Sequence, residues 1–147
     1  MGPQAPRGVK GLSGIVAVTE TVVDGLEGSG IPLFAGWRAA ARADDDAGRI
    51  AQLMQILREW RGGFHLVSTT ATGLSPLEAI STNEGEGQAK FFGWSEPFPD
   101  CGSIAAKHGE VEAMTDQLSV SSFNRALGRD RFEEFEAAVS TIHASLP

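Results

Sequence analysis

The sequence predicts an all-α fold, and three observations support this prediction. Apolar residues recur at helical spacing from residue 50 to 60 and again from residue 132 to 146. Glycines at 62–63 and 73 divide residues 57–80 into the end of one helix and two further helices. After these helices, no two segments show the alternating apolar and polar residues of a β-hairpin. The predicted architecture is a winged-helix or helix-turn-helix-like helical domain whose wing is reduced or absent.

The length and composition are those of one folded domain. A chain of 147 residues can bury a hydrophobic core, and we expect a single helical domain over residues 12–147. Residues 1–11 are rich in proline and glycine and are expected to form a disordered lead. No apolar run is long enough to cross a membrane, and no signal peptide is recognised. The single cysteine, Cys101, excludes an internal disulfide, and these features together predict a cytoplasmic protein.

Two short segments are expected to precede the central helices. Residues 12–26 carry apolar side chains close to helical spacing, although the valine-rich part is also compatible with a short strand. After a glycine-rich break, residues 32–37 resume the chain as a short helix or turn. Three aspartates at 44–46 are suited to cap the next helix, because negative charge is favourable at a helix N-terminus.

The central helices have stronger signals. Residues 50–60 place their apolar side chains on one face, and this helix is expected to end at the Gly62–Gly63 pair. Ser75, Pro76 and Glu78 have the spacing of a capping box, with proline in the first turn. A short helix is therefore predicted to begin at this point.

The C-terminal half is expected to contain two longer helices. Residues 88–94 predict one or two helical turns, and the two prolines within residues 95–100 require an extended segment. A helix is then predicted over residues 110–127 and a second one over residues 132–146. The inward residues of the first are expected to be Val111, Met114, Leu118 and Phe123.

The two terminal helices also predict a homodimer. In residues 132–146 the apolar side chains alternate at spacings of three and four, which is a narrow seam suited to packing against another helix. This seam and the apolar stripe of residues 12–26 expose more apolar surface than a small domain buries easily. We therefore expect pairing with a second copy of the chain.

The charge of the chain argues against specific recognition of DNA. Its net charge is −7, whereas DNA-binding proteins draw much of their affinity from lysine and arginine. The helix predicted from Ser75 to Asn83 takes the place of a recognition helix, yet its only charged candidate is Glu78. Helices that read bases usually offer arginine, lysine, asparagine or glutamine. We expect weak or no specific binding to duplex DNA.

Arg61 and His65 are candidates for binding or for acid–base chemistry. They stand four positions apart and share one face if the helix continues through the glycine pair. Arginine binds anions, and histidine titrates near neutral pH. The alternative is structural, with Arg61 paired to Glu59 or Glu78 and His65 hydrogen-bonded to a helix end.

A cluster of aromatic residues predicts a pocket for a flat apolar ligand. The prolines of residues 95–100 would hold one wall rigid, and Arg61 and His65 would orient the ligand. The alternative is that the aromatic side chains fill the core or an interface. No Cys/His cluster has the spacing of a metal site, so neither a metal nor a cofactor is expected. The candidate ligand-binding residues are Trp60, Arg61, His65, Phe91, Phe92, Trp94 and Phe98.

Four motifs carry a resemblance to a known family. They are Gly30-Ile31-Pro32-Leu33-Phe34-Ala35, Leu57-Arg58-Glu59-Trp60-Arg61-Gly62-Gly63-Phe64-His65, Gly73-Leu74-Ser75-Pro76-Leu77-Glu78-Ala79 and Thr115-Asp116-Gln117-Leu118. In these motifs the chain resembles the actinobacterial SalK-type helix-turn-helix-like family. The resemblance covers residues 30–127 and corresponds only to the C-terminal half of family members. It implies a fold far more than a function.

Three classes of function follow from these patterns. We favour a helix-turn-helix-derived module that binds a small molecule or a protein partner, in actinobacterial specialised metabolism or its regulation. The first alternative is a dimeric transcriptional regulator whose basic residues lie outside the third helix. The second is a small cofactor-free enzyme of specialised metabolism that uses Arg61 and His65.

Overall fold

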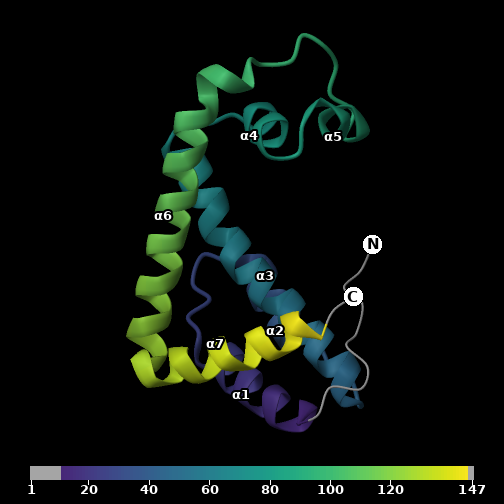
Figure 1. Cartoon of the computed structure of the whole chain (residues 1–147), viewed down its shortest axis with the longest axis vertical. Coiled ribbons are helices and arrows are strands. Elements are labelled where there is room, and N and C mark those ends of the chain that lie inside the picture. Colours follow the sequence, from purple (N-terminus) through teal and green to yellow (C-terminus); the bar gives the residue numbers. More distant parts are fainter. Residues whose placement is uncertain (1–10, 146–147) are drawn as a thin grey trace. The chain divides into compact units, whose positions relative to one another are not determined.

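The computed structural model describes residues 11–145, and these residues form seven helices (Figure 1). In chain order the helices are α1 (Leu12–Gly25), α2 (Pro32–Ala39), α3 (Asp46–Ala71), α4 (Pro76–Asn83), α5 (Glu86–Phe91), α6 (Cys101–Leu127) and α7 (Arg129–Ala144). The all-α prediction is confirmed.

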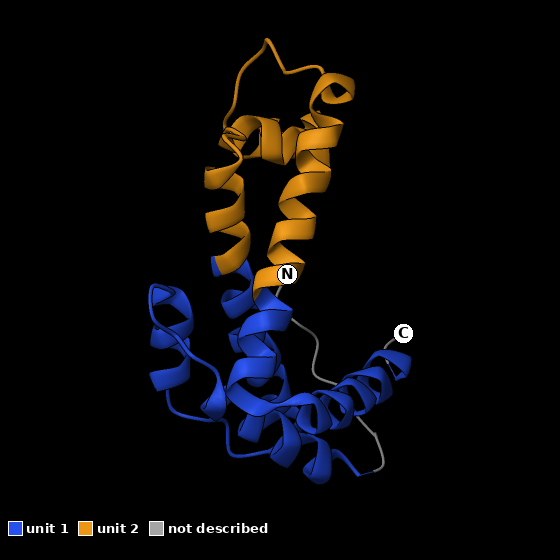
Figure 2. Cartoon of the chain, turned by 90° about the vertical axis from the view of Figure 1, so that its left-hand side faces the viewer, with its two compact units in different colours: residues 1–63, 119–147 blue, residues 64–118 orange. Residues whose placement is uncertain are grey.

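The chain divides into two compact units (Figure 2). Unit 1 comprises residues 1–63 and 119–147, and unit 2 comprises residues 64–118. Helices α3 and α6 contribute to both units, because their bounds cross these limits. The predicted lead at residues 1–11 falls almost wholly outside the described residues, and the single domain over residues 12–147 stays a prediction.

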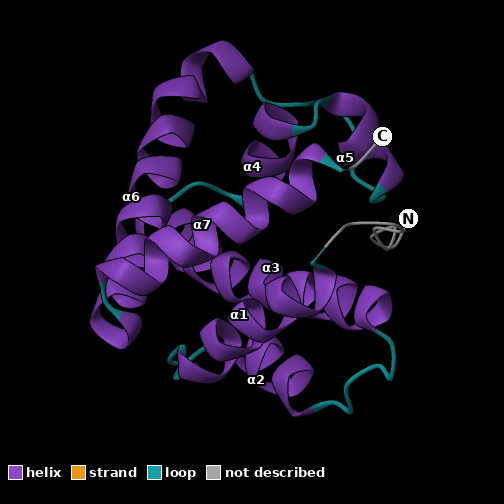
Figure 3. Cartoon of the chain, turned by 60° about the horizontal axis from the view of Figure 1, so that its bottom comes forward, coloured by secondary structure: helices purple, strands orange, loops and turns teal. Residues whose placement is uncertain are grey.

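The segment in which a winged helix would carry its wing is a loop. Helix α5 covers part of the predicted helical segment at residues 88–94, and residues 95–100 form neither helix nor strand, as the prolines predicted. Figure 3 shows helices, loops and turns only, and no strand occurs within the described residues. A β-hairpin wing therefore has no counterpart in that part of the chain.

The core of unit 1 is built from α1, α2 and the first part of α3. Two polar contacts fasten the loop between α1 and α2 onto this core. The indole N–H of Trp60 donates to the Glu27 carbonyl at 3.1 Å, and the Arg38 guanidinium donates to the Leu26 carbonyl at 2.7 Å. The apolar side chains of these three helices and the loop between α1 and α2 that are exposed by no more than 2% are Val22, Val23, Leu26, Phe34, Ile50, Leu53 and Ile56.

The two terminal helices pack against each other within unit 1. Residues 12–26 are helical over α1, which excludes the alternative of a strand. Helix α7 packs against α1, and the stripe residues Val23 of α1 and Ile142 of α7 are buried. Part of the apolar surface that led us to expect a homodimer is thus covered inside one chain, while Phe132, Phe135 and Val139 of α7 are half-buried. Homodimerization itself stays a prediction, without that argument.

The predicted helix end at Gly62–Gly63 is wrong. Helix α3 starts at the predicted aspartates, where the Asp45 carboxylate accepts an N–H of the first turn at 2.8 Å, and it continues without a break to Ala71. A Cβ atom added at Gly63 would lie 2.5 Å from Cγ2 of Ile31, whereas one at Gly62 would meet nothing within 4 Å. Gly63 therefore makes room for a neighbouring side chain and does not end the helix.

Helix α6 begins nine residues earlier than the predicted start at residue 110. The Asp100 side chain caps it by accepting the N–H of Gly102 at 3.0 Å. Val111 and Phe123 are buried as predicted, but Met114 is 36% exposed. The neighbouring Thr115 is fully buried instead, and its hydroxyl donates to a carbonyl one turn back in the helix.

Candidate functional site

The turn between α3 and α4 lies in unit 2 and has a well-defined backbone. Helix α3 ends in a Schellman motif, in which the N–H of Leu74 donates to the Thr69 carbonyl and the N–H of Gly73 to the Thr70 carbonyl, both at 3.1 Å. Gly73 has φ +67°, a left-handed conformation that favours glycine. Leu74 is buried, so the turn is anchored in the apolar interior of the unit.

The start of α4 is the predicted capping box. The Ser75 hydroxyl accepts the N–H of Glu78 at 3.3 Å, and the Glu78 carboxylate accepts the N–H of Ser75 at 2.8 Å. The hydrogen bond from the Ser75 backbone, followed by that from its side chain, lowers the pKa of Glu78 below its ordinary value. Glu78 therefore carries a negative charge at neutral pH at the entrance of α4.

Unit 2, which contains this turn, is strongly acidic. With its histidines neutral, its formal net charge is −6, nearly all of the chain's −7. Its lysines already have partners: Lys90 Nζ lies 3.3 Å from Glu96 and 3.9 Å from Glu86, and Lys107 Nζ donates to the Gly73 carbonyl at 3.4 Å. The unit contains two lysines, no arginine, and the carboxylates of Glu78, Glu84, Glu86, Glu96, Asp100, Glu110, Glu112 and Asp116.

Helix α4 lacks the side chains of a base-reading helix. From Pro76 to Asn83 it contains one carboxylate, one amide, two hydroxyls and no cation. The amide of Asn83 is exposed at the last position of the helix, while Ser81 is buried. Affinity for phosphates comes mainly from cations, and α4 offers none, while the rest of unit 2 offers only Lys90, paired with Glu86 and Glu96, and Lys107.

Three aromatic side chains form an exposed apolar group in unit 2. Phe91, Phe92 and Trp94, which we call the aromatic tip, are 79%, 58% and 41% exposed. The rings of Phe91 and Phe92 meet edge to face, with 5.5 Å between their centroids. A second Schellman motif holds the backbone, because the N–H of Trp94 donates to the Ala89 carbonyl and Gly93 has φ +86°.

A lysine ammonium is bound beside the aromatic tip. Lys90 Nζ lies between the carboxylates of Glu86 and Glu96 and 5.2 Å from the centroid of the Phe98 ring. A cavity of about 500 Å³ at this place is lined by Glu86, Glu96, Pro97 and Phe98. With the Lys90 ammonium in place, the two carboxylates leave one net negative charge beside a ring face, which suits an organic cation.

The seven residues predicted to bind a ligand are distributed over both units. Trp60 and Arg61 belong to unit 1, and the other five belong to unit 2. Trp60 is 6% exposed and packs in the core, so it offers little surface to a ligand. Phe91 and Phe92 touch each other, whereas Phe98 meets Lys90.

His65 and Arg61 stand one turn apart on the continuous helix α3, so the condition for a shared face is met. Within unit 2 the His65 Nε2 atom lies 3.0 Å from a carboxylate oxygen of Glu112 on α6. The Thr69 hydroxyl lies 3.5 Å from His65 Nδ1 and donates to the His65 carbonyl. His65 thus links α3 to α6, as an ion pair when its imidazole is protonated.

Sequence reasoning missed Glu86, Lys90 and Glu96 as partners of the aromatic residues. The spacing of four between Glu86 and Lys90 was an available signal, although the predicted helical segment began only at residue 88. The contact of Lys90 with Phe98 follows from the path of the connecting loop, which no local pattern encodes.

Two further observations bear on the class of site. Within residues 11–145 no helix is long and apolar enough to cross a membrane. In the same part of the chain, no three histidine, cysteine or carboxylate side chains are grouped so that they could hold a metal ion.

Comparison with known proteins supports the helix-turn-helix architecture. A helix-turn-helix family matches residues 2–99, which is about two thirds of the chain. No curated protein and no solved structure matches the chain significantly. The match does not extend to the SalK-type or actinobacterial assignment. Modules of this architecture commonly bind DNA or act in regulation. The family match covers about two thirds of the chain, and the all-α fold agrees with it. The chain therefore belongs to a helix-turn-helix family.

Proposed function

We propose that this protein is a helix-turn-helix-derived interaction module that binds a basic protein partner through its aromatic tip and does not read duplex DNA. The observation that carries the proposal is the exposure of Phe91, Phe92 and Trp94 on a unit with a formal net charge of −6. Aromatic residues are enriched in the energetically dominant parts of protein interfaces.

The charge of unit 2 is the main argument against DNA. A protein that neutralises phosphates must supply lysine or arginine, and each phosphate contact strengthens the dependence of binding on salt. Of the two lysines of unit 2, Lys90 is paired with Glu86 and Glu96, and Lys107 donates to the Gly73 carbonyl but keeps its charge. Eight carboxylates in the same unit would repel the phosphate backbone.

The same charge favours a basic partner. The carboxylates of Glu86 and Glu96 and the Phe98 ring already hold one ammonium, that of Lys90, and these two carboxylates and this ring also line the neighbouring cavity. A lysine or arginine of a partner could use Glu86 and Glu96 in the same way, while apolar side chains cover the tip. Complementary charge of this kind mainly raises the rate of association and excludes acidic competitors.

A protein partner suits the tip better than a small ligand. Pockets for small molecules enclose most of the ligand surface. Phe91 and Phe92 are more than half exposed, so they present a surface and not an enclosure. Binding of a flat apolar ligand remains the alternative for this segment.

The resemblance to the SalK-type family extends the proposal to a role in actinobacterial specialised metabolism or its regulation, in the cytoplasm. Two other functions have less support from the described contacts. An enzyme using Arg61 and His65 would have to function with His65 held by Glu112. A dimeric regulator would need cations outside unit 2.

The test uses the full chain and a model basic partner. The probe is a fluorescent amphipathic helical peptide of leucine and lysine, and its counterpart replaces every lysine by glutamate. We expect the lysine peptide to raise its anisotropy with the protein and the glutamate peptide not to do so. Replacing Phe91 and Phe92 together by serine should weaken binding at least about tenfold, because burial of each ring contributes roughly 1.5–3 kcal/mol.

A matched control is available in the same unit. Leu66 and Val67 on α3 are also exposed, at 68% and 55%, and lie outside the tip, so their double replacement by serine should leave binding unchanged. Absence of binding, equal binding of both peptides, or equal loss in the two double variants would contradict the proposal. If the chain alone self-associates and only the tip variant abolishes this, the partner is a second copy and not a different protein.

A further inference from the structure

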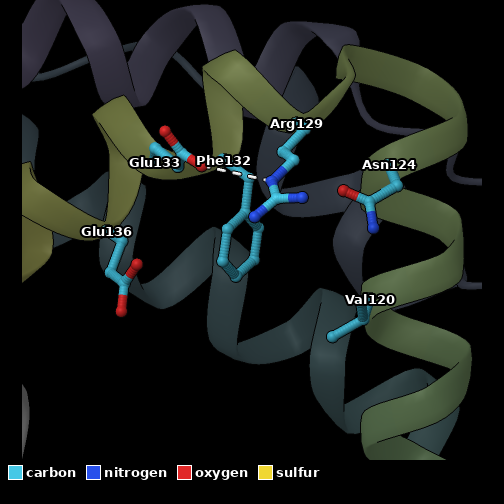
Figure 4. Close-up of a pocket in the computed structure, with 6 residues that line it drawn as sticks. All are labelled: Val120, Asn124, Arg129, Phe132, Glu133 and Glu136. Atoms are coloured by element: carbon cyan, nitrogen blue, oxygen red, sulfur yellow. Dashed lines mark hydrogen bonds and ion pairs between the residues drawn. The ribbon is translucent and has the colours of Figure 1, made fainter.

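A second cavity lies in unit 1, outside the residues that match the helix-turn-helix family. It has a volume of about 350 Å³ and lies where α6 ends and α7 begins (Figure 4). This volume is within the range of small-molecule pockets. The residues that line it are Val120, Asn124, Arg129, Phe132, Glu133 and Glu136.

The apolar part of the cavity is formed by Phe132 and Val120. Phe123 is 4% exposed and packs edge to face against the Phe132 ring, with 5.2 Å between the ring centroids. This contact holds the Phe132 ring in place. Val120 is 45% exposed, so its side chain is open to contact. Figure 4 shows the Phe132 ring between Glu136 on one side and Val120 on the other. A rigid ring beside an uncovered valine is a surface for an apolar group of a ligand.

Two of the three charged residues that line the cavity pair with each other, and the third does not pair with them. Arg129 Nε lies 3.2 Å from a carboxylate oxygen of Glu133, so these two charges balance each other. Within residues 11–145 Glu136 forms no ion pair, and its side chain lines the cavity from α7 (Figure 4). The Asn124 amide faces the cavity from α6 and offers a further acceptor. A ligand that matches this lining therefore carries one positive charge and an apolar group.

We propose that this cavity binds a small organic monocation, namely an amine or amidine with an aromatic or branched apolar group. The apolar group lies against Phe132 and Val120, and the cation is held by the carboxylate of Glu136. The inference does not depend on the proposed function, because the cavity lies in unit 1 and the aromatic tip lies in unit 2. It would give the module a site for a small effector that is separate from its partner surface.

The test is an NMR titration of the full ¹⁵N-labelled chain with 2-phenylethylamine, which is protonated at neutral pH. A fragment of this size should bind with a dissociation constant on the order of millimolar, with saturable shifts confined to amides near residues 120–136. Glu136→Gln should weaken binding about two- to fivefold, as expected for an exposed ion pair. Charge reversal in Glu136→Lys should weaken it more, because the lysine repels the ammonium.

Two controls separate this site from general attraction to an acidic protein. Glu134→Gln removes a carboxylate of α7 that pairs with Arg131 and does not line the cavity, so it should leave binding unchanged. The anion 3-phenylpropionate keeps the apolar body and should not bind. Absence of saturable shifts, equal binding of the anion, or equal affinities of Glu136→Gln and the wild type would overturn the inference.

Discussion

Replacing the two adjacent glycines of α3 by alanine, one at a time, tests whether this helix is continuous. An alanine Cβ at position 62 meets no atom within 4 Å, so Gly62→Ala adds only helix propensity, about 0.5–1 kcal/mol of stability. An alanine at position 63 has the same propensity, but its Cβ lies 2.5, 3.0 and 3.2 Å from Cγ2, Cγ1 and Cβ of Ile31.

Ile31 has little freedom to move away from this added atom. It is 7% exposed, and rotation about χ1 of a β-branched side chain only exchanges one branch for another. Overpacking of this kind destabilises by about 1–3 kcal/mol. After allowing for propensity, we expect Gly63→Ala to lose about 1–2 kcal/mol, so the two variants should differ by about 2 kcal/mol.

Thermal unfolding of the full chain, followed by far-UV circular dichroism, measures this difference. In a chain of this size 1 kcal/mol shifts Tm by about 2–4 °C, so Gly62→Ala should melt about 4–8 °C above Gly63→Ala. Destabilisation by Gly62→Ala would refute the continuous helix, because alanine is unfavourable in a left-handed break. Equal stability of the two variants would refute the close contact with Ile31.

Three further predictions concern hydrogen bonds. Trp60→Phe removes the N–H that donates to the Glu27 carbonyl and part of a buried ring, and thermal unfolding should show a loss of at least about 1–2 kcal/mol; no change would mean that neither the bond nor the burial contributes. Ser75→Ala removes the cap of α4 and should lose about 1 kcal/mol in the same assay, whereas an unchanged Tm would exclude the capping box. The pKa of Glu78 is lowered in the folded chain, so its contribution to stability is present above the ordinary value of 4.5 and is lost as the pH falls through the folded value. Urea unfolding from about pH 6 to about pH 3 should therefore show a smaller acid-induced loss in Glu78→Gln than in the wild type, and equal losses would contradict the shift.

Features that depend on neighbouring residues in the sequence could be predicted. The capping box of Ser75 and Glu78 forms as its spacing indicated, and an aspartate of the run at 44–46 caps α3. The helix near the C-terminus was also predicted from apolar spacing, and the one near the N-terminus was predicted with a short strand as the alternative. Each of these signals concerns residues within one or two helical turns of each other.

Features that depend on distant residues could not be predicted. The role of Gly63 follows from Ile31, which lies 32 positions away in the sequence. The apolar faces of α1 and α7 suggested a dimer because these helices come from opposite ends of the chain. Their packing against each other is not visible in the sequence. The choice between pocket, core and interface for Phe91 and Phe92 likewise depends on what packs around α5, and the exposure of these two side chains is known only from the folded unit.

Our central proposal is that this helix-turn-helix protein does not read duplex DNA. The direct measurement is repeated selection of the full chain against a pool of randomised duplexes at physiological salt, followed by mobility shifts of the recovered sequences. The charge of unit 2 and the absence of a cation on α4 predict that no sequence is enriched and that any binding seen at low salt disappears. Enrichment of one sequence, bound at physiological salt and lost on mutation of its bases, would contradict the claim.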